Sequence, residues 1–117
     1  MDYGSEHNFP PSNIPRGVGS HPHRGIETVT IAYKGRVAHH DSEGNSGIIG
    51  ENDVQWMTAG GGILHKEYHE DEFNRKGGPF QMVQLWVNLP AKYKMTKAKY
   101  QDLLFNNAKK FISDNMK

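Results

Sequence analysis

Four side chains in this sequence have the types and the spacing to bind a metal ion. They form two pairs, His21 with His23 and His65 with Glu67, and a single residue separates the members of each pair. Alternate side chains of an extended strand share one face, so each pair would direct both members to the same side. Two such strands facing each other would offer three imidazoles and one carboxylate to one ion.

This donor set suits several divalent metals. Three nitrogens and one oxygen fit Fe(II), Mn(II), Ni(II), Co(II) or Zn(II) and leave two exchangeable positions on an octahedral ion. The chain has no cysteine, so histidine and carboxylate are the strong ligands available. An isolated His-x-His pair is equally well explained as two half-buried polar residues. Two pairs at strand spacing, the second preceded by Gly60-Gly61-Gly62, favour a metal site.

The remaining histidines are weaker candidates. His39 and His40 are adjacent and would face opposite sides of a strand, so at most one points inward, and a surface or satisfied core histidine is the preferred interpretation. The same interpretation applies to His7 and His69, which fall in predicted loops. Glu27 shares strand parity with the first histidine pair and is the reserve carboxylate if the fourth ligand is not the predicted one.

Several short β segments would position these ligands. Runs rich in β-branched and aromatic residues alternate with glycine-containing turns about every ten residues, a pattern typical of an all-β sandwich or closed barrel. The predicted strands cover residues 26–33, 36–41, 48–49, 54–57, 63–68 and 80–89. A charged run over 69–78 is predicted to be a surface loop.

The flanking segments differ from this core. Residues 1–20 are polar and carry Pro10, Pro11 and Pro15, which predicts a loop-like arm leading into a metal-binding domain over 21–90. Residues 91–117 are predicted to form a linker and a short helix that Thr96 would cap. The apolar residues at helical spacing are Tyr100, Leu103, Leu104, Ala108, Phe111 and Ile112.

Length and charge restrict the class of protein. The 117 residues suit one domain, and the net charge of +1 gives no bulk electrostatic case for nucleic acid or an anionic membrane as a partner. No apolar run approaches the length of a membrane span, and residues 1–20 lack the pattern of a signal peptide. We therefore expect a cytoplasmic protein.

Four sequence blocks carry a family resemblance. They are HPHRGIETVT at 21–30, DVQWMTAG at 53–60, GILHKE at 62–67 and QLWVNL at 84–89. Together they resemble the N-terminal domain of pirins, members of the cupin superfamily, over about residues 2–101. The resemblance implies a jelly-roll β-barrel and one metal ion, typically iron but also Mn, Ni, Co, Cu or Zn, bound by the residues matching His21, His23, His65 and Glu67.

The resemblance also implies an activity. Some pirins act as quercetin 2,3-dioxygenases, which open a flavonol ring with O₂, and eukaryotic members serve as transcription cofactors. In a dioxygenase, Glu67 would accept or steer the proton of the flavonol hydroxyl, because a carboxylate beside a metal-acidified hydroxyl can take its proton. Gln84 would line the substrate pocket. A buried amide that satisfies backbone groups is an equally good interpretation of Gln84.

Pirins normally contain two cupin domains, with further strands before the segment that matches Asp2. This chain is therefore expected to correspond to part of the first domain, and uncovered barrel surface predicts a homodimer or higher oligomer. The alternative functions are a non-catalytic, metal-dependent regulatory module and a truncated fragment that folds around a metal. Direct nucleic-acid binding is the poorest hypothesis, because no basic stripe with interleaved aromatics is present.

Overall fold

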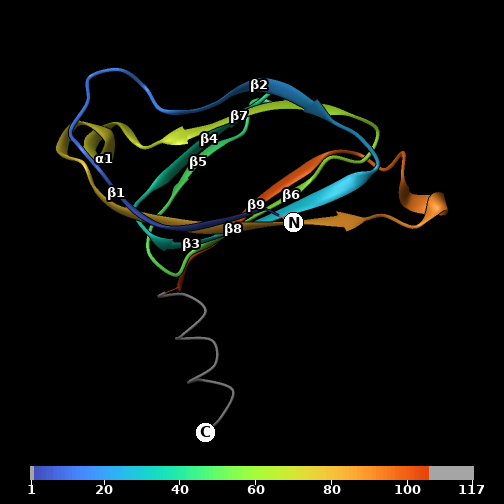
Figure 1. Cartoon of the computed structure of the whole chain (residues 1–117). Coiled ribbons are helices and arrows are strands. Elements are labelled where there is room, and N and C mark those ends of the chain that lie inside the picture. Colours follow the sequence, from blue (N-terminus) through green and yellow to red (C-terminus); the bar gives the residue numbers. More distant parts are fainter. Residues whose placement is uncertain (1, 106–117) are drawn as a thin grey trace, which may run out of the picture.

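Two antiparallel sheets face each other in the computed structural model, which describes residues 2–105 and their side chains from residue 6 onward (Figure 1). The five-stranded sheet has the order β1 (Asp2–Phe9), β8 (Gly78–Asn88), β3 (Ile26–Lys34), β6 (Val54–Thr58), β9 (Lys99–Leu103). The four-stranded sheet has the order β2 (Gly17–His23), β7 (Ile63–His69), β4 (Val37–Asp41), β5 (Ser46–Ile49). The predicted all-β sandwich is confirmed.

The central strand β3 illustrates why the sequence folds this way. It is rich in β-branched residues, which suit a pleated, half-buried surface, and it pairs with β6 on one side and β8 on the other. Gly35 follows it at φ +88°, a conformation that glycine adopts without strain. A Cβ at this position would overlap the Phe80 ring, so the turn also packs tightly on β8.

Apolar and polar side chains share the interior. One apolar cluster contains Ala32, Val37 and Ile49, and a second contains Met57, Ala59 and Ile63. Polar side chains are buried there as well, and the most completely buried of them among the described residues are Thr28, Thr30, His39, Gln55 and His65. Because burying an unpaired polar group costs about 1–3 kcal/mol, this polar half of the interior needs a network of partners.

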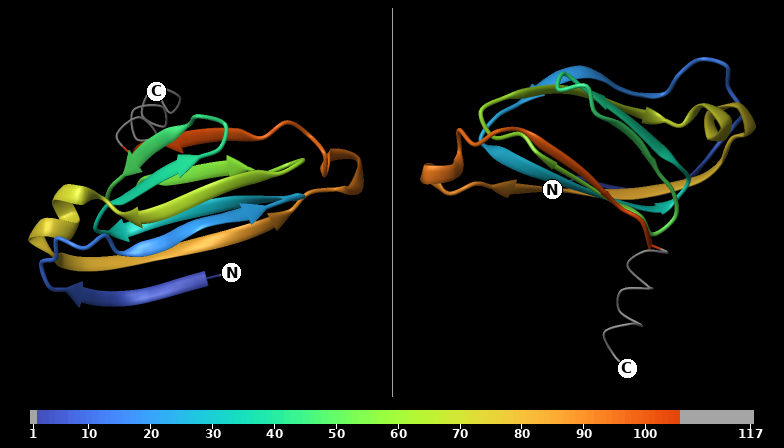
Figure 2. Two further views of the ribbon diagram at one scale, coloured as in Figure 1. Left: turned by 90° about the horizontal axis from the view of Figure 1, so that it is seen from above. Right: turned by 180° about the vertical axis from the view of Figure 1, so that it is seen from behind.

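The N-terminal arm is not loop-like throughout, and this prediction is wrong for two stretches. Asp2–Phe9 forms edge strand β1 against β8, and Figure 2 shows the two strands side by side. Gly17–His23 forms β2, so the irregular part is confined to residues 10–16. An edge strand tolerates polar residues because one of its edges faces solvent. Pro10, Pro11 and Pro15 lie between the two strands, and only Pro22 lies within β2.

The helix predicted to begin at Thr96 is wrong over Lys99–Leu103, which forms edge strand β9 against β6. Tyr100 and Asp102 are half-buried while their neighbours are exposed, so burial alternates with the period of a strand. Pairing with the free edge of β6 outweighs the local helical spacing. Leu104 follows the strand without regular structure, and the part of that prediction beyond residue 105, with Ala108, Phe111 and Ile112, lies outside the described residues.

The charged run at 69–78 contains a short helix, α1 (Asp71–Lys76), where a loop was predicted. The Glu70 side chain caps it by accepting the backbone N–H groups of Glu72 and Phe73. A 3-10 turn, η1 (Ala91–Tyr93), follows β8. None of the helices within residues 2–105 is long and apolar enough to cross a membrane.

Candidate metal centre

The two predicted ligand pairs lie on neighbouring strands of one sheet rather than on facing walls of a barrel. β2 runs antiparallel to β7, and His21 lies directly opposite His65 in the register. His23, His65 and Glu67 are buried and His21 is half-buried. Members of each pair share the inner face, as the strand spacing predicts, and the register brings the pairs together.

The three imidazoles converge. His21 Nε2 lies 2.8 Å from His65 Nε2, and His23 Nε2 is buried without a hydrogen-bond partner. The Gly19 carbonyl lies 2.7 Å from His21 Nδ1; it can only accept, so Nδ1 carries the proton and Nε2 presents a lone pair. Two nitrogens at right angles on one ion, each about 2.0–2.1 Å from it, are about 2.9 Å apart. The nitrogens therefore fit a shared divalent metal.

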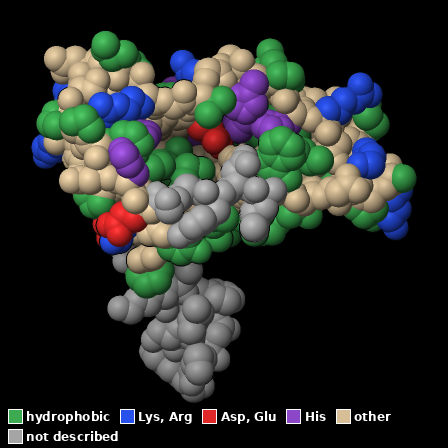
Figure 3. All heavy atoms as spheres, viewed as in Figure 1, with side chains coloured by type: hydrophobic (Ala, Val, Ile, Leu, Met, Phe, Trp, Pro, Cys, Tyr) green, Lys and Arg blue, Asp and Glu red, His purple; other side chains and the backbone are tan. Residues whose placement is uncertain are grey.

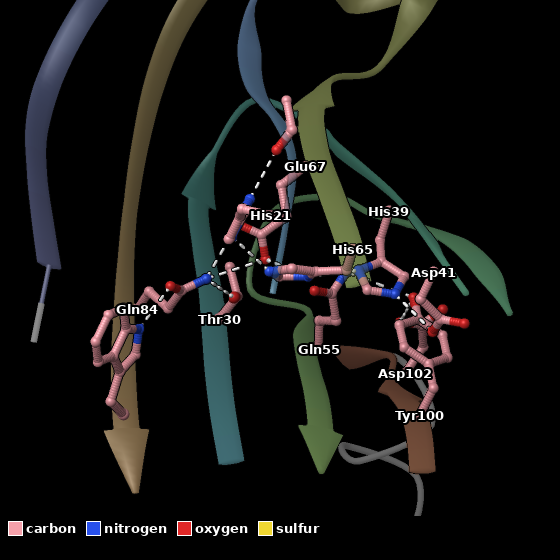
Figure 4. A network of polar contacts seen from close by, with 12 residues as sticks. His21, Thr30, His39, Asp41, Gln55, His65, Glu67, Gln84, Tyr100 and Asp102 are labelled. Atoms are coloured by element: carbon pink, nitrogen blue, oxygen red, sulfur yellow. Dashed lines mark hydrogen bonds and ion pairs between the residues drawn. The ribbon is translucent and has the colours of Figure 1, made fainter. Parts of the chain in front are cut away.

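Glu67 lies beside this cluster and is held by Gln84, as Figure 4 shows. Gln84 Nε2 donates to both carboxylate oxygens at 3.0 Å and to Thr30 Oγ1 at 3.0 Å. The Trp86 Nε1–H donates to Gln84 Oε1 at 3.0 Å, which orients the amide with its NH₂ group toward the carboxylate. The amide therefore serves other side chains rather than the backbone.

No single group contains all four predicted ligands. Within residues 2–105, two sets of potential ligand atoms lie within 4.8 Å of one another: His21, His23 and His65 form one, and His39, His65 and Glu67 form the other. Glu67 Oε1 is 3.9 Å from His65 Nδ1, so it approaches the ring nitrogen that faces away from His21. His65 is the member common to both sets.

His39 lies beside the predicted ligands, although sequence reasoning gave it no role in the site. Its side chain is fully buried on β4, with Nδ1 3.4 Å from His65 Nδ1 and Nε2 2.9 Å from Asp41 Oδ2. The expectation of a satisfied core histidine describes His39 correctly, and His40 faces solvent. The available signal was the spacing of His39 and Asp41, two residues apart on one strand like the other pairs.

The other sequence candidates lie elsewhere. His7 is exposed on β1. His69 is not in a loop but at the buried end of β7, where its ring stacks on Phe80 at 4.3 Å. The reserve carboxylate Glu27 accepts a hydrogen bond from Thr58 Oγ1 at 2.8 Å and belongs to neither set of potential ligands within residues 2–105.

The buried histidines of the site are held in the neutral form. Burial, followed by the neighbouring histidines, lowers the pKa of His65 to about 3. Burial and His21 lower the pKa of His23, and burial lowers the pKa of His39 although Asp41 opposes it. Burial raises the pKa of Glu67 against the hydrogen bond from Gln84. Neutral imidazole is the form that ligates metals, so the site is prepared for one at neutral pH.

A pocket opens onto this cluster. Its volume is about 510 Å³, within the usual range for small-molecule sites. Figure 3 shows acidic and histidine side chains together in a hollow between the sheets. The lining residues include His21, His23, Glu67, Gln84 and Trp86. A small molecule that entered the pocket would reach both the imidazoles and the carboxylate.

The fold and this donor set define a β-sandwich protein with a candidate divalent-metal site between its sheets. The chain belongs to the pirin family, whose family model matches residues 1–87. The family resemblance read from the sequence motifs is thereby confirmed.

Individual relatives agree with this membership. One relative is a Pseudomonas aeruginosa protein that is provisionally named a quercetin 2,3-dioxygenase. It is 60% identical over 104 residues, which cover 89% of this chain and 36% of that protein. A crystal structure of quercetin 2,3-dioxygenase from Acinetobacter baumannii is 60% identical with a TM-score of 0.84, covering 86% of this chain and 35% of that one. The Escherichia coli pirin YhhW in complex with nickel(II) is 27% identical with a TM-score of 0.65, covering 86% and 39%. The chain thus spans little more than a third of the length of these relatives.

Proposed function

We propose that His21, His23 and His65 bind one divalent metal ion, that the Glu67 carboxylate turns toward it as the fourth ligand, and that the chain provides the metal centre of a quercetin 2,3-dioxygenase-type enzyme. One observation carries the proposal. The Nε2 atoms of His21 and His65 approach to 2.8 Å beside the unpartnered Nε2 of His23. Buried polar nitrogens without partners are costly, and a shared cation would satisfy all three.

The side chains around the ion would have distinct roles. A bound metal supplies Lewis acidity, which lowers the pKa of a flavonol hydroxyl group. Glu67 is the proposed catalytic base for that hydroxyl proton, because it lines the pocket and its raised pKa improves it as a proton acceptor. Gln84 holds the carboxylate and contributes to substrate binding from the pocket wall. The Trp86 indole offers a flat apolar surface for an aromatic ring.

The relatives support the enzyme over a non-catalytic regulatory module, because two of those described above carry quercetin 2,3-dioxygenase names. We propose Fe(II) as the first choice of metal. Mn, Ni, Co, Cu and Zn are the alternatives, since nitrogen and carboxylate donors accept all of them. The nickel in the Escherichia coli pirin is a property of that protein.

Metal binding and turnover test the proposal together. The chain is freed of metal, titrated with each of these ions by calorimetry, and assayed for quercetin-dependent O₂ uptake. We expect one ion per chain and O₂ uptake with at least one metal, both lost in His65→Ala. The control is His40→Ala, an exposed histidine on a neighbouring strand, which should retain both. Absence of metal binding and of O₂ uptake with every ion would refute the proposal.

We further propose that the chain forms a homodimer in the cytoplasm without direct contact to nucleic acid. Exposed apolar side chains such as Trp56, Trp86 and Leu64 and the edge strands β1 and β9 favour self-association, because apolar patches and unpaired strand edges invite partners. Light scattering coupled to gel filtration measures the mass directly. A monomer at all concentrations would contradict the dimer.

A further inference from the structure

His65 has different neighbours at its two ring nitrogens. Its Nε2 faces His21 at 2.8 Å, and its Nδ1 faces His39 Nδ1 at 3.4 Å. His39 in turn contacts Asp41 through its other nitrogen at 2.9 Å. Asp41, His39 and His65 therefore form a hydrogen-bonded relay from β4 to β7, and the side chains of all three are fully buried (Figure 4).

The position of each proton along this relay follows from Asp41. Its Oδ1 accepts the backbone N–H groups of Glu43 and Asn45 at 2.9 and 3.0 Å, and its Oδ2 faces His39 Nε2. An ionised carboxylate only accepts, so His39 must donate from Nε2. A neutral imidazole has one donor and one acceptor nitrogen, and His39 Nδ1 is therefore an acceptor.

The same rule fixes the next ring. Because His39 Nδ1 accepts, His65 must donate from Nδ1, and its Nε2 is left with a lone pair directed at His21. We propose that Asp41 and His39 are positioning residues that hold His65 in the tautomer whose Nε2 can bind the metal. This inference rests on the proposed metal site and adds two residues that do not contact the ion.

The packing around His39 keeps its ring in place. The Tyr100 ring stacks on it with centroids 4.5 Å apart and planes 19° from parallel. The Tyr100 hydroxyl donates to Asp102 Oδ1 at 2.6 Å and lies 3.4 Å from Gln55 Nε2. Edge strand β9 thus closes the side of the relay, and the ring of His39 cannot turn without disturbing this stack.

Asp41→Asn tests the relay because its consequence can be traced atom by atom. The two backbone N–H groups select the amide oxygen of the substituted side chain, so its NH₂ group faces His39 Nε2. His39 must then accept at Nε2 and donate at Nδ1, which forces His65 to accept at Nδ1 and to carry its proton on Nε2. We expect metal affinity to fall about 10- to 100-fold, as is usual when an outer-shell partner of a ligand is lost.

Asp53→Asn is the matched control. Asp53 also accepts two backbone N–H groups, from Gly50 at 2.8 Å and Phe105 at 2.7 Å, but no histidine hydrogen-bonds to it among the described residues. Its two N–H partners lie on different carboxylate oxygens, whereas both partners of Asp41 lie on Oδ1, so Asp53→Asn loses one of its two bonds. It should therefore lose at least as much turn stability as Asp41→Asn without changing metal affinity. If both variants lose affinity equally, the effect is a general loss of stability and the relay is overturned.

Nitrogen NMR of the metal-free chain separates this inference from the proposed function. Two-bond ¹H–¹⁵N spectra should show His65 protonated at Nδ1 in the parent chain and at Nε2 in Asp41→Asn. His39→Phe keeps the stack on Tyr100 but removes the acceptor, so it should give a mixture of His65 tautomers. A parent chain with the Nδ1–H form but no metal affinity would refute the metal site alone. A parent chain with His65 protonated at Nε2, or a second ion bound through His65 Nδ1, would overturn the relay.

Discussion

Acidification should destabilise the metal-free chain, because its buried histidines stay neutral in the fold. The pKa of His65 is lowered to about 3 from a usual value of 6.5. Above pH 6.5 both states are neutral and the full stability is present. As the pH falls below 6.5 the unfolded chain binds protons that the folded chain does not, so the free energy of unfolding decreases until the pH passes the folded pKa.

The size of the effect follows from the same shift. A pH of 5 lies about 1.5 units below the pKa of 6.5 that His65 has in the unfolded chain. At about 1.36 kcal/mol per unit, His65 alone therefore lowers the free energy of unfolding by about 2 kcal/mol. His23 and His39 have lowered pKa values as well and act in the same direction. Glu67 acts in the opposite direction, because its raised pKa lets the folded state bind a proton first. Three histidines therefore lower the free energy of unfolding on acidification, and one carboxylate raises it, so we expect a net loss of stability.

Urea unfolding in the presence of a chelator, at about pH 7.5 and about pH 5, measures the difference. The control is His7→Gln, which removes an exposed histidine and should leave the pH dependence unchanged. His65→Asn should reduce it. Equal stability of the parent chain at the two pH values would show that these imidazoles are not held neutral, and the electrostatic account of the site would be wrong.

Three further predictions concern the metal, the carboxylate and the fold. A divalent metal at 100 times its dissociation constant should stabilise the chain by about 2.7 kcal/mol. The stabilisation should appear as a higher melting temperature, and a chelator should abolish it. An unchanged melting temperature would argue against a metal site in the folded state. Gln84→Leu removes both hydrogen bonds to the Glu67 carboxylate and should cost about 1–3 kcal/mol of unfolding free energy in urea, whereas unchanged stability would mean that the carboxylate does not need them. Gly60→Ala should lower the free energy of unfolding by about 1–3 kcal/mol, because Gly60 has φ +55° and a Cβ there would overlap the Thr96 carbonyl. The control is Gly19→Ala, whose Cβ would meet nothing within 4 Å and which should leave the stability nearly unchanged.

The sequence by itself determined which side chains could share a face. The period of a strand is two residues, so His21 and His23 point the same way, as do His65 and Glu67, wherever their strands lie. The turn glycines and β-branched runs likewise predicted most of the strands. These are local properties, because each depends on residues next to one another in the chain.

The tertiary structure alone decided which strands are neighbours. The register that sets His21 against His65, and the pairing of β4 with β7 that brings in His39, arise from contacts between distant segments. The polar stretch of β1 and the helically spaced residues at the start of β9 became strands because free sheet edges offered them backbone hydrogen bonds. No periodicity within a segment encodes such a partner, since strand pairing depends on which long-range contacts bury the most surface and satisfy the most backbone groups.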